Sequence, residues 1–129
     1  MLIRLVPTET VYGLAANALD ESAVAKIYEI KQRPRFNPII VHVRSSEDFA
    51  KYAADVPEKA MMLASEFSPG PVTFVMKKKD VIPDIVTAGH DSVGLRIPDH
   101  PLLLNLIDAC GFPLAAPSAN MFGRISPTS

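Results

Sequence analysis

The sequence from Lys31 to Val43, KQRPRFNPIIVHV, decides the fold, because a helical pattern stops there and a strand pattern begins. Residues 23–32 repeat apolar side chains at helical spacing, and Ser22 is expected to cap this helix. Pro34 disfavours helical geometry at the residue before it, so the helix is expected to stop there. Residues 39–43 are apolar on both faces apart from one histidine, which is typical of an interior strand.

The same alternation of helices and strands continues through most of the chain. Further strands are expected at residues 2–6, 72–76, 93–97 and 114–116, and further helices at residues 46–53, 57–67 and 102–109. Alternating elements of this kind favour an α/β fold built on one open, twisted sheet with flanking helices. Many of the twelve prolines fall at element boundaries, where binding loops of such sheets lie.

Composition limits the classes of protein that this chain can represent. A length of 129 residues with 48% hydrophobic and 21% charged residues predicts one globular domain, residues 1–129, with a substantial core. A formal net charge of -1 excludes a globally basic nucleic-acid binder, although it allows a local basic patch. Cys110 is the single cysteine and is expected to be a packing residue in a reducing compartment. No apolar run approaches the ~20 residues of a membrane span, and the apolar N-terminus is too short for a signal peptide, so a cytoplasmic protein is expected.

Lys31 is the unusual residue of the first helix, because it continues the apolar stripe formed by Val24, Ile27 and Tyr28. A lysine there must extend its ammonium to solvent or face a polar cavity. The helix dipole offers another explanation, since a cation in the last turn gains roughly 0.3–1 kcal/mol. A cluster of Lys31, Arg33 and His42 at one end of the sheet would suit a polyanion such as a triphosphate. A lone histidine in a strand is more often a core residue, and the sequence leaves the two interpretations open.

Arg96 lies inside the apolar strand at residues 93–97, where an unpaired charge is costly. Its anionic partner is expected to be either an internal carboxylate, from Glu9 or Asp99, or the carboxylate of a ligand. The sequence does not decide between them.

Two further segments carry hydroxyl groups close to expected strands. Residues 7–14, PTETVYGL, present two threonines that either bind a polar ligand or cap the start of a helix. Residues 115–120, AAPSAN, combine small residues with serine and asparagine, which suits close approach of a ligand but also a polar surface turn. The lysines at 77–79 are interpreted as a solvated strand exit and Arg35 as a surface charge.

Five segments in this order closely resemble the YrdC-like family, the threonylcarbamoyl-AMP synthases. The segments are PTETVYGLAANA, KQRPRFNPIIVHV, SPGPVTFV, SVGLRIPDHPL and PLAAPSAN followed by SPT. The resemblance implies a twisted, mixed α/β open sheet with a concave, positively charged face. It also implies that L-threonine, bicarbonate and ATP condense to threonylcarbamoyl-AMP and pyrophosphate, a nucleotidyl transfer. A separate transferase complex would then deliver the threonylcarbamoyl group to an adenosine of tRNA. A direct contact between the synthase and tRNA is a further expectation.

The resemblance also implies roles for individual residues, carried over from the matching motif positions. Lys31 and Arg33 are expected to be catalytic. The expected ATP contacts are Lys31, Arg33, Asn37, Ser92, Ser118 and Ser126, and the expected threonine contacts are Thr8, His42, Arg96 and Ala116. Mg²⁺ is expected to accompany the ATP phosphates, with no metal site made of protein side chains alone.

The resemblance also predicts that the chain is short at both ends, because family members usually continue beyond these segments. Dimerisation that covers sheet edges exposed in this way is a hypothesis that follows. Two other functions remain open at this point: a carbamoyl-transfer domain of the hydrogenase-maturation type and a non-catalytic RNA-binding module.

Overall fold

The computed structural model describes residues 3–8, 11–32, 34–70 and 72–117, with the backbone alone for residues 3–8 and 11–14. The strands are β1 (Ile3–Thr8), β2 (Val11–Asn17), β3 (Val41–His42), β4 (Thr73–Lys77), β5 (Ser92–Arg96) and β6 (Leu114–Ala115). The helices are α1 (Glu21–Lys31), α2 (Phe49–Tyr52), α3 (Glu58–Phe67) and α4 (Pro101–Cys110), with a 3₁₀ turn, η1 (Ser46–Asp48), leading into α2.

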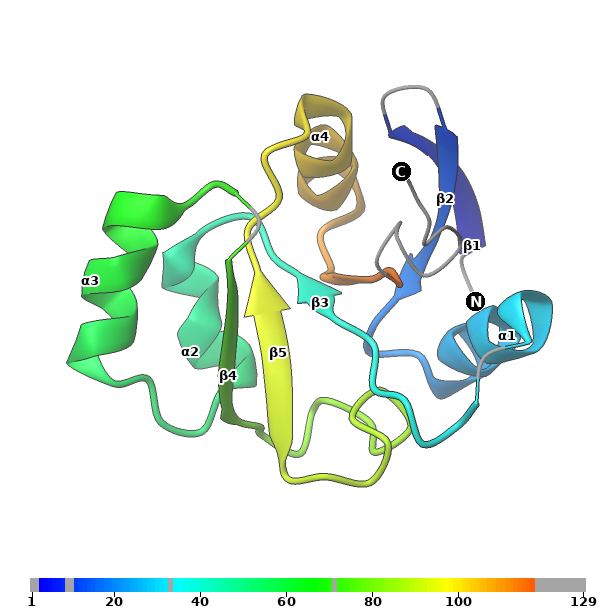
Figure 1. The fold of residues 1–129 in the computed structure, drawn as a ribbon, viewed down its shortest axis with the longest axis horizontal. Coiled ribbons are helices and arrows are strands. Elements are labelled where there is room, and N and C mark those ends of the chain that lie inside the picture. Colours follow the sequence, from blue (N-terminus) through cyan, green and yellow to red (C-terminus); the bar gives the residue numbers. More distant parts are fainter. Residues whose placement is uncertain (1–2, 9–10, 33, 71, 118–129) are drawn as a thin grey trace.

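The strands form one open sheet in the order β1-β2-β6-β3-β5-β4. Only the β3–β5 pair is parallel among these described strands, and the other four pairs are antiparallel. The expected α/β class with a single mixed sheet is therefore confirmed. Figure 1 shows the sheet with α3 beyond one end of it and α1 beside the other.

The N-terminal hairpin differs from the sequence-based expectation of a strand followed by a loop or helix start. β1 continues through Pro7, which pairs with Tyr12 of β2. β1 is an edge strand, where a residue without a backbone N–H is tolerated. Residues 11–17 therefore form a strand, and the helix start proposed for residues 7–14 is wrong.

Helix α1 begins two residues earlier than expected, because Asp20 and not Ser22 is its N-cap. The Asp20 carboxylate accepts hydrogen bonds from the backbone N–H groups of Ser22, at 2.9 Å, and Ala23, at 3.3 Å. The helix ends at Lys31, and Gln32 follows with a left-handed backbone, φ 53°. The predicted stop before Pro34 is confirmed.

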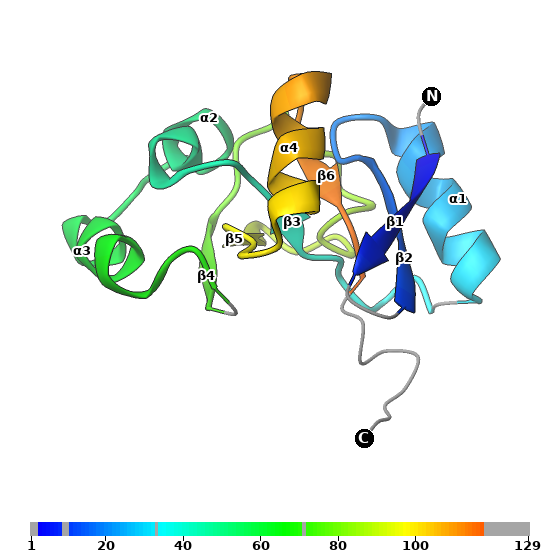
Figure 2. The same ribbon diagram turned by 90° about the horizontal axis from the view of Figure 1, so that it is seen from above.

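The core lies on both faces of the sheet but covers them unequally. The larger cluster packs α1 and α2 against one face and includes Ile27, Phe49 and Leu95. A smaller cluster packs α4 onto the other face through Leu103, Ile107 and Leu114. No described helix lies in front of β4 and β5 in Figure 1, and Figure 2 shows α2 behind them. One face of β4 and β5 is consequently open.

Alternation along β4 and β5 determines which side chains occupy this open face. Phe74, Met76, Val93 and Leu95 are buried in the core, and the residues between them are half-buried or exposed. Thr73 pairs with Arg96, Val75 with Gly94 and Lys77 with Ser92 across the two strands. The two neighbouring strands therefore present hydroxyl, apolar and cationic groups on one surface.

Candidate functional site

A groove of about 190 Å³ follows the open face of β4 and β5. It is lined by Pro38, Ile39, Ile40, Thr73, Val75, Thr87, His90, Ser92 and Gly94. The groove joins the segment after α1 to the two strands. The sequence predicted a nucleotide loop at the same segment and a nucleotide contact at Ser92.

Arg96 lies at the end of β5 and is half-buried. Its Nε and Nη2 donate hydrogen bonds to Thr73 Oγ1 at 2.9 and 2.7 Å. Burial lowers the pKa of Arg96, and the charge of Asp99 acts in the opposite direction. In the described part of the chain, Arg96 makes no ion pair with a carboxylate. Asp99 is therefore not its ion-pair partner, and Glu9 lies outside the described residues.

His42 lies beside Arg96, because β3 and β5 are parallel and place the two residues in register. The side chain is only 6% exposed. Burial, and secondly the charge of Arg96, lowers the pKa of His42 from 6.5 to about 4. A hydrogen bond with the Leu114 backbone acts in the opposite direction. The imidazole is therefore neutral at pH 7.

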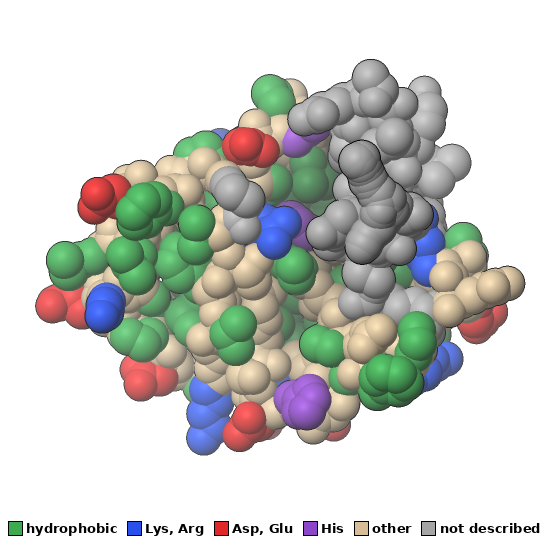
Figure 3. Space-filling view, in the orientation of Figure 1, with side chains coloured by type: hydrophobic (Ala, Val, Ile, Leu, Met, Phe, Trp, Pro, Cys, Tyr) green, Lys and Arg blue, Asp and Glu red, His purple; other side chains and the backbone are tan. Residues whose placement is uncertain are grey.

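The Nδ1 atom of His42 is buried and has no hydrogen-bond partner among the described residues. Buried polar atoms are nearly always satisfied, so an atom of this kind needs an explanation. Figure 3 shows a histidine and a cationic side chain next to one another above the open face of β4 and β5. A ligand with an anionic group and a second polar group would give Arg96 a counter-charge and His42 Nδ1 a hydrogen-bond partner.

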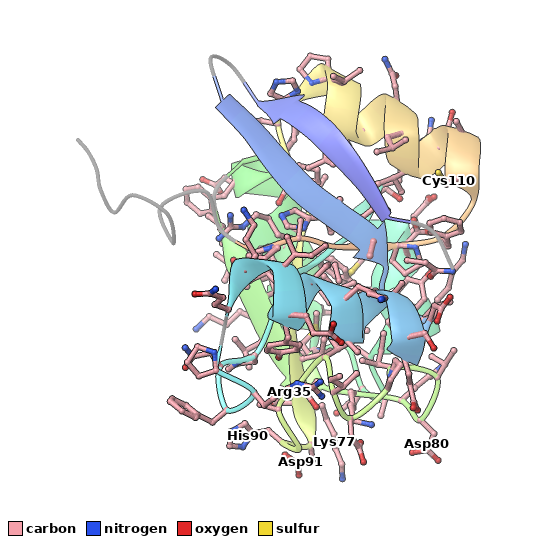
Figure 4. The ribbon with its side chains drawn as sticks, turned by 90° about the vertical axis from the view of Figure 1, so that its right-hand side faces the viewer. Arg35, Lys77, Asp80, His90, Asp91 and Cys110 are labelled. Atoms are coloured by element: carbon pink, nitrogen blue, oxygen red, sulfur yellow. The ribbon has the colours of Figure 1, made fainter. Side chains whose placement is uncertain are left out.

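The segment after α1 is attached to the rest of the fold by Tyr28. The Tyr28 hydroxyl lies 2.7 Å from the carbonyl oxygen of Asn37 and 3.0 Å from that of Ile85. Arg35 lies over the Tyr28 ring, with its guanidinium carbon 5.4 Å from the ring centroid. Figure 4 shows Arg35 and His90 toward the same end of the molecule, and Cys110 far from them. Tyr28 thus connects the predicted nucleotide loop to the residues that precede β5.

Lys31, the last residue of α1, is half-buried, and this burial lowers its pKa. The helical stripe predicted from the sequence is observed, since Val24, Ile27 and Tyr28 are all buried. Whether Arg33 joins Lys31 and His42 stays a prediction, because Arg33 lies outside the described residues.

The remaining predicted residues are placed as follows. Thr8 is the last residue of β1, but its side chain is not described. Ala116 follows β6 and donates its N–H to the Ile40 carbonyl oxygen at 3.2 Å. Ser118 and Ser126 lie outside the described residues. The structure therefore brings His42 and Arg96 together and places Ser92 in the adjoining groove.

The sequence did not identify Thr73 as the partner of Arg96. The only available signal was the alternation of residues 72–76, which gives the face of Thr73 but not its register with β5. That register joins residues far apart in the chain. A period-two pattern excludes slips of one residue, but it does not say which strand is the neighbour or which of the remaining registers is formed.

A second cavity, of about 260 Å³, lies between residues 43–52 and the C-terminal end of α4. Its charged side chains are largely paired with each other: Arg44 with Asp108 at 3.0 Å and Lys51 with Asp48 at 3.1 Å. The smaller groove lies beside Arg96, which has no carboxylate partner among the described residues, and His42, whose buried Nδ1 has no hydrogen-bond partner there. We therefore regard that groove, with Arg96 and His42, as the candidate site.

No group of three or more His, Cys, Asp or Glu side chains among the described residues is arranged to hold a metal ion. Among the same residues, no helix has the length and apolar character needed to cross a membrane.

Known proteins resemble this chain over most of its length. A model of the Sua5/YciO/YrdC family, described as "Telomere recombination", matches residues 3–129. The threonylcarbamoyl-AMP synthases of Pyrococcus abyssi and Bacillus subtilis are 53% and 50% identical to the chain, each over 123 residues that make up 95% of this chain. The chain spans 36% of the length of each of these two relatives.

A crystal structure of P. abyssi Sua5 complexed with L-threonine has a TM-score of 0.88 with this structure, at 51% sequence identity. The match covers 98% of this chain and 37% of that one. The extent of the family match and the level of identity show that the chain belongs to the Sua5/YciO/YrdC family.

Proposed function

We propose that this chain condenses L-threonine, bicarbonate and ATP into threonylcarbamoyl-AMP and pyrophosphate. The observation that carries the proposal is that Arg96 and His42 lie side by side on β5 and β3. Arg96 has no carboxylate partner among the described residues, and His42 is buried and neutral. The names of the two curated relatives and the L-threonine complex of the P. abyssi protein support the choice of substrate.

The amino acid would bind at the end of β5. Its carboxylate would accept charge-assisted hydrogen bonds from Arg96, which explains why a cation is kept in an otherwise apolar strand. His42 Nδ1 would bond to another polar group of the same ligand and would no longer be a buried atom without a partner. Thr8 and Ala116 are the further threonine contacts in this proposal.

The nucleotide would lie along the groove on β4 and β5. Apolar residues such as Val75 and Ile40 suit a base, and Ser92 supplies a hydroxyl group. Asn37, Ser118 and Ser126 complete the proposed ATP contacts, and Lys31 and Arg33 would face the phosphates. Mg²⁺ would enter as part of the nucleotide substrate, bound to the ATP phosphates.

The proposed chemistry needs no covalent intermediate with the protein. The threonine amine attacks bicarbonate and water leaves, which gives a carbamate. A carbamate oxygen then attacks the α-phosphorus of ATP and the bond to pyrophosphate breaks. The side chains hold the two reactants in place and offset the negative charge of the phosphates.

The product is a mixed anhydride and therefore an acyl donor. In this proposal a separate transferase complex consumes it and modifies tRNA, in the cytoplasm, where ATP and tRNA are available. The reaction makes the chain a nucleotidyltransferase in the chemical sense.

A labelling experiment tests the proposal. The chain is incubated with ATP, L-threonine and radiolabelled bicarbonate, and pyrophosphate and a labelled nucleotide adduct are followed. Label incorporation that depends on threonine is the expected result. Turnover with carbamoyl phosphate in place of bicarbonate and threonine would favour the carbamoyl-transfer alternative. Salt-sensitive tRNA binding without turnover would favour the RNA-binding alternative.

A further inference from the structure

We propose that Thr73 is a positioning residue that orients Arg96 toward the carboxylate of the amino acid. This inference rests on the proposed function, because it takes Arg96 as the group that binds the carboxylate. It starts from an observation independent of any relative: one threonine oxygen accepts two hydrogen bonds from the same guanidinium group.

The geometry of these two bonds determines which edge of Arg96 remains available. Nε and one hydrogen of Nη2 point at Thr73 Oγ1, so the side edge of the guanidinium is occupied. A guanidinium has five N–H donors, and the three that remain are both hydrogens of Nη1 and the second hydrogen of Nη2. Those groups form the end of the fork, which presents two parallel donors to a carboxylate.

The chemical nature of Thr73 fits this role. A hydroxyl oxygen accepts hydrogen bonds without carrying a negative charge, so Arg96 is oriented but its charge is not neutralised. An aspartate at the same place would form an internal ion pair and compete with the ligand. The threonine side chain therefore fixes the direction of Arg96 and leaves its full charge for the amino acid.

Gly94 gives Thr73 the space that this arrangement needs. A Cβ atom built on Gly94 would lie 3.0 Å from Thr73 Cγ2, closer than an ordinary van der Waals contact. The Thr73 side chain is thus bonded to Arg96 through its oxygen, and its methyl group lies against the space that a side chain at position 94 would fill. A side chain at position 94 would press on that methyl group and shift the hydroxyl away from Arg96.

Thr73→Val and Thr73→Ser are the matched variants that test this inference. Valine keeps the shape of the side chain and loses the acceptor oxygen, whereas serine keeps the oxygen. We expect Thr73→Val to weaken L-threonine binding about tenfold or more in calorimetry, and Thr73→Ser to change it less than about threefold.

A ligand without the carboxylate separates orientation from packing. L-threoninol should bind weakly, and equally so, to the wild-type chain and to Thr73→Val. A loss of threoninol affinity as large as the loss for threonine would indicate a packing defect and would overturn the inference.

A measurement on the ligand-free chain distinguishes this inference from the proposed function. The Arg96 Nε–H resonance should exchange slowly with water in the wild type and in Thr73→Ser, and faster in Thr73→Val and Gly94→Ala. Equal exchange in wild type and Thr73→Val overturns the inference, whether or not threonine binds. Tight threonine binding by Thr73→Val also overturns it and leaves the proposed function standing. A wild-type chain that binds no threonine overturns the proposed function, and the carboxylate-directing role of Thr73 with it.

Discussion

Acidification should destabilise this protein through His42, and the size of the effect follows from its burial. The unfolded chain binds a proton at this histidine below about pH 6.5, the ordinary value. In the folded chain the pKa is about 4, because the ring is buried and Arg96 lies beside it. Between these two values the unfolded state binds more protons, so the stabilising contribution is complete above pH 6.5 and is lost as the pH falls toward 4.

The expected magnitude comes from the difference between the two pKa values. Each unit of pKa difference corresponds to about 1.4 kcal/mol between the protonation states. Proton linkage at this one site then lowers the free energy of unfolding by about 2 kcal/mol at pH 5 and about 3 kcal/mol at pH 4, relative to pH 7. A loss of this size is a large part of the stability of a single domain.

The assay compares urea unfolding of the wild-type chain and a His42→Gln variant at pH 7, 6, 5 and 4. His42→Gln can lower the free energy of unfolding by the same amount at every pH, because the amide packs differently from the imidazole. The quantity compared is therefore the change in the free energy of unfolding between pH 7 and pH 4. Carboxylates elsewhere titrate in both proteins and cancel in the difference. We expect the wild type to lose about 3 kcal/mol more than the variant between pH 7 and pH 4. Parallel pH dependences in the two proteins would refute the reasoning.

Four further substitutions test separate parts of the structure. Arg96→Lys is expected to weaken L-threonine binding at least about tenfold in calorimetry, because an ammonium does not offer two parallel donors to a carboxylate; unchanged affinity would remove Arg96 from the binding site. Tyr28→Phe is expected to raise the KM for ATP and to lower the free energy of unfolding by about 1 kcal/mol, because the hydroxyl that donates to the Asn37 carbonyl is lost. An unchanged KM would show that this hydrogen bond does not contribute to nucleotide binding. Lys31→Ala is expected to abolish pyrophosphate release with an unchanged circular dichroism spectrum, and full activity would exclude a catalytic role. Gly111→Ala is expected to lower the free energy of unfolding, measured with urea, by about 1 kcal/mol. The cause is backbone strain alone, because φ is 77° at this position and no atom lies within 4 Å of the added Cβ. An unaltered unfolding midpoint would mean that the C-terminal cap of α4 accommodates alanine without strain.

Much of the fold was predictable because its signals are local. The helical spacing of Val24, Ile27 and Tyr28 and the stop at Pro34 depend on residues within a few positions of each other, and the structure confirms both. β2 was missed for a related reason. Its sequence, VYGLAAN, contains glycine and alanine, which have little strand preference, and its pairing with β1 and β6 supplies what the local sequence lacks.

The candidate site was predictable only in part, because register between distant strands decides it. The sequence identified His42 and Arg96 as unusual residues but left open whether each was internal or functional. Their adjacency follows from the parallel pairing of β3 with β5, which no periodic pattern encodes. The role of Thr73 depends on a second register, that of β4 with β5, and was missed for the same reason.

The parallel pairing of β3 and β5 links the candidate site to the stability of the sheet. His42 and Arg96 meet only when two distant parts of the chain are both in place, so a partly unfolded molecule has no site. The amino acid would then bind the native state alone, and its binding energy would add to the resistance of the whole sheet to unfolding, by RT ln(1 + [L]/Kd). Threonine binding and unfolding of the central strands would then be coupled. A rise in melting temperature with threonine concentration would show both that the site is occupied and that the central strands are folded.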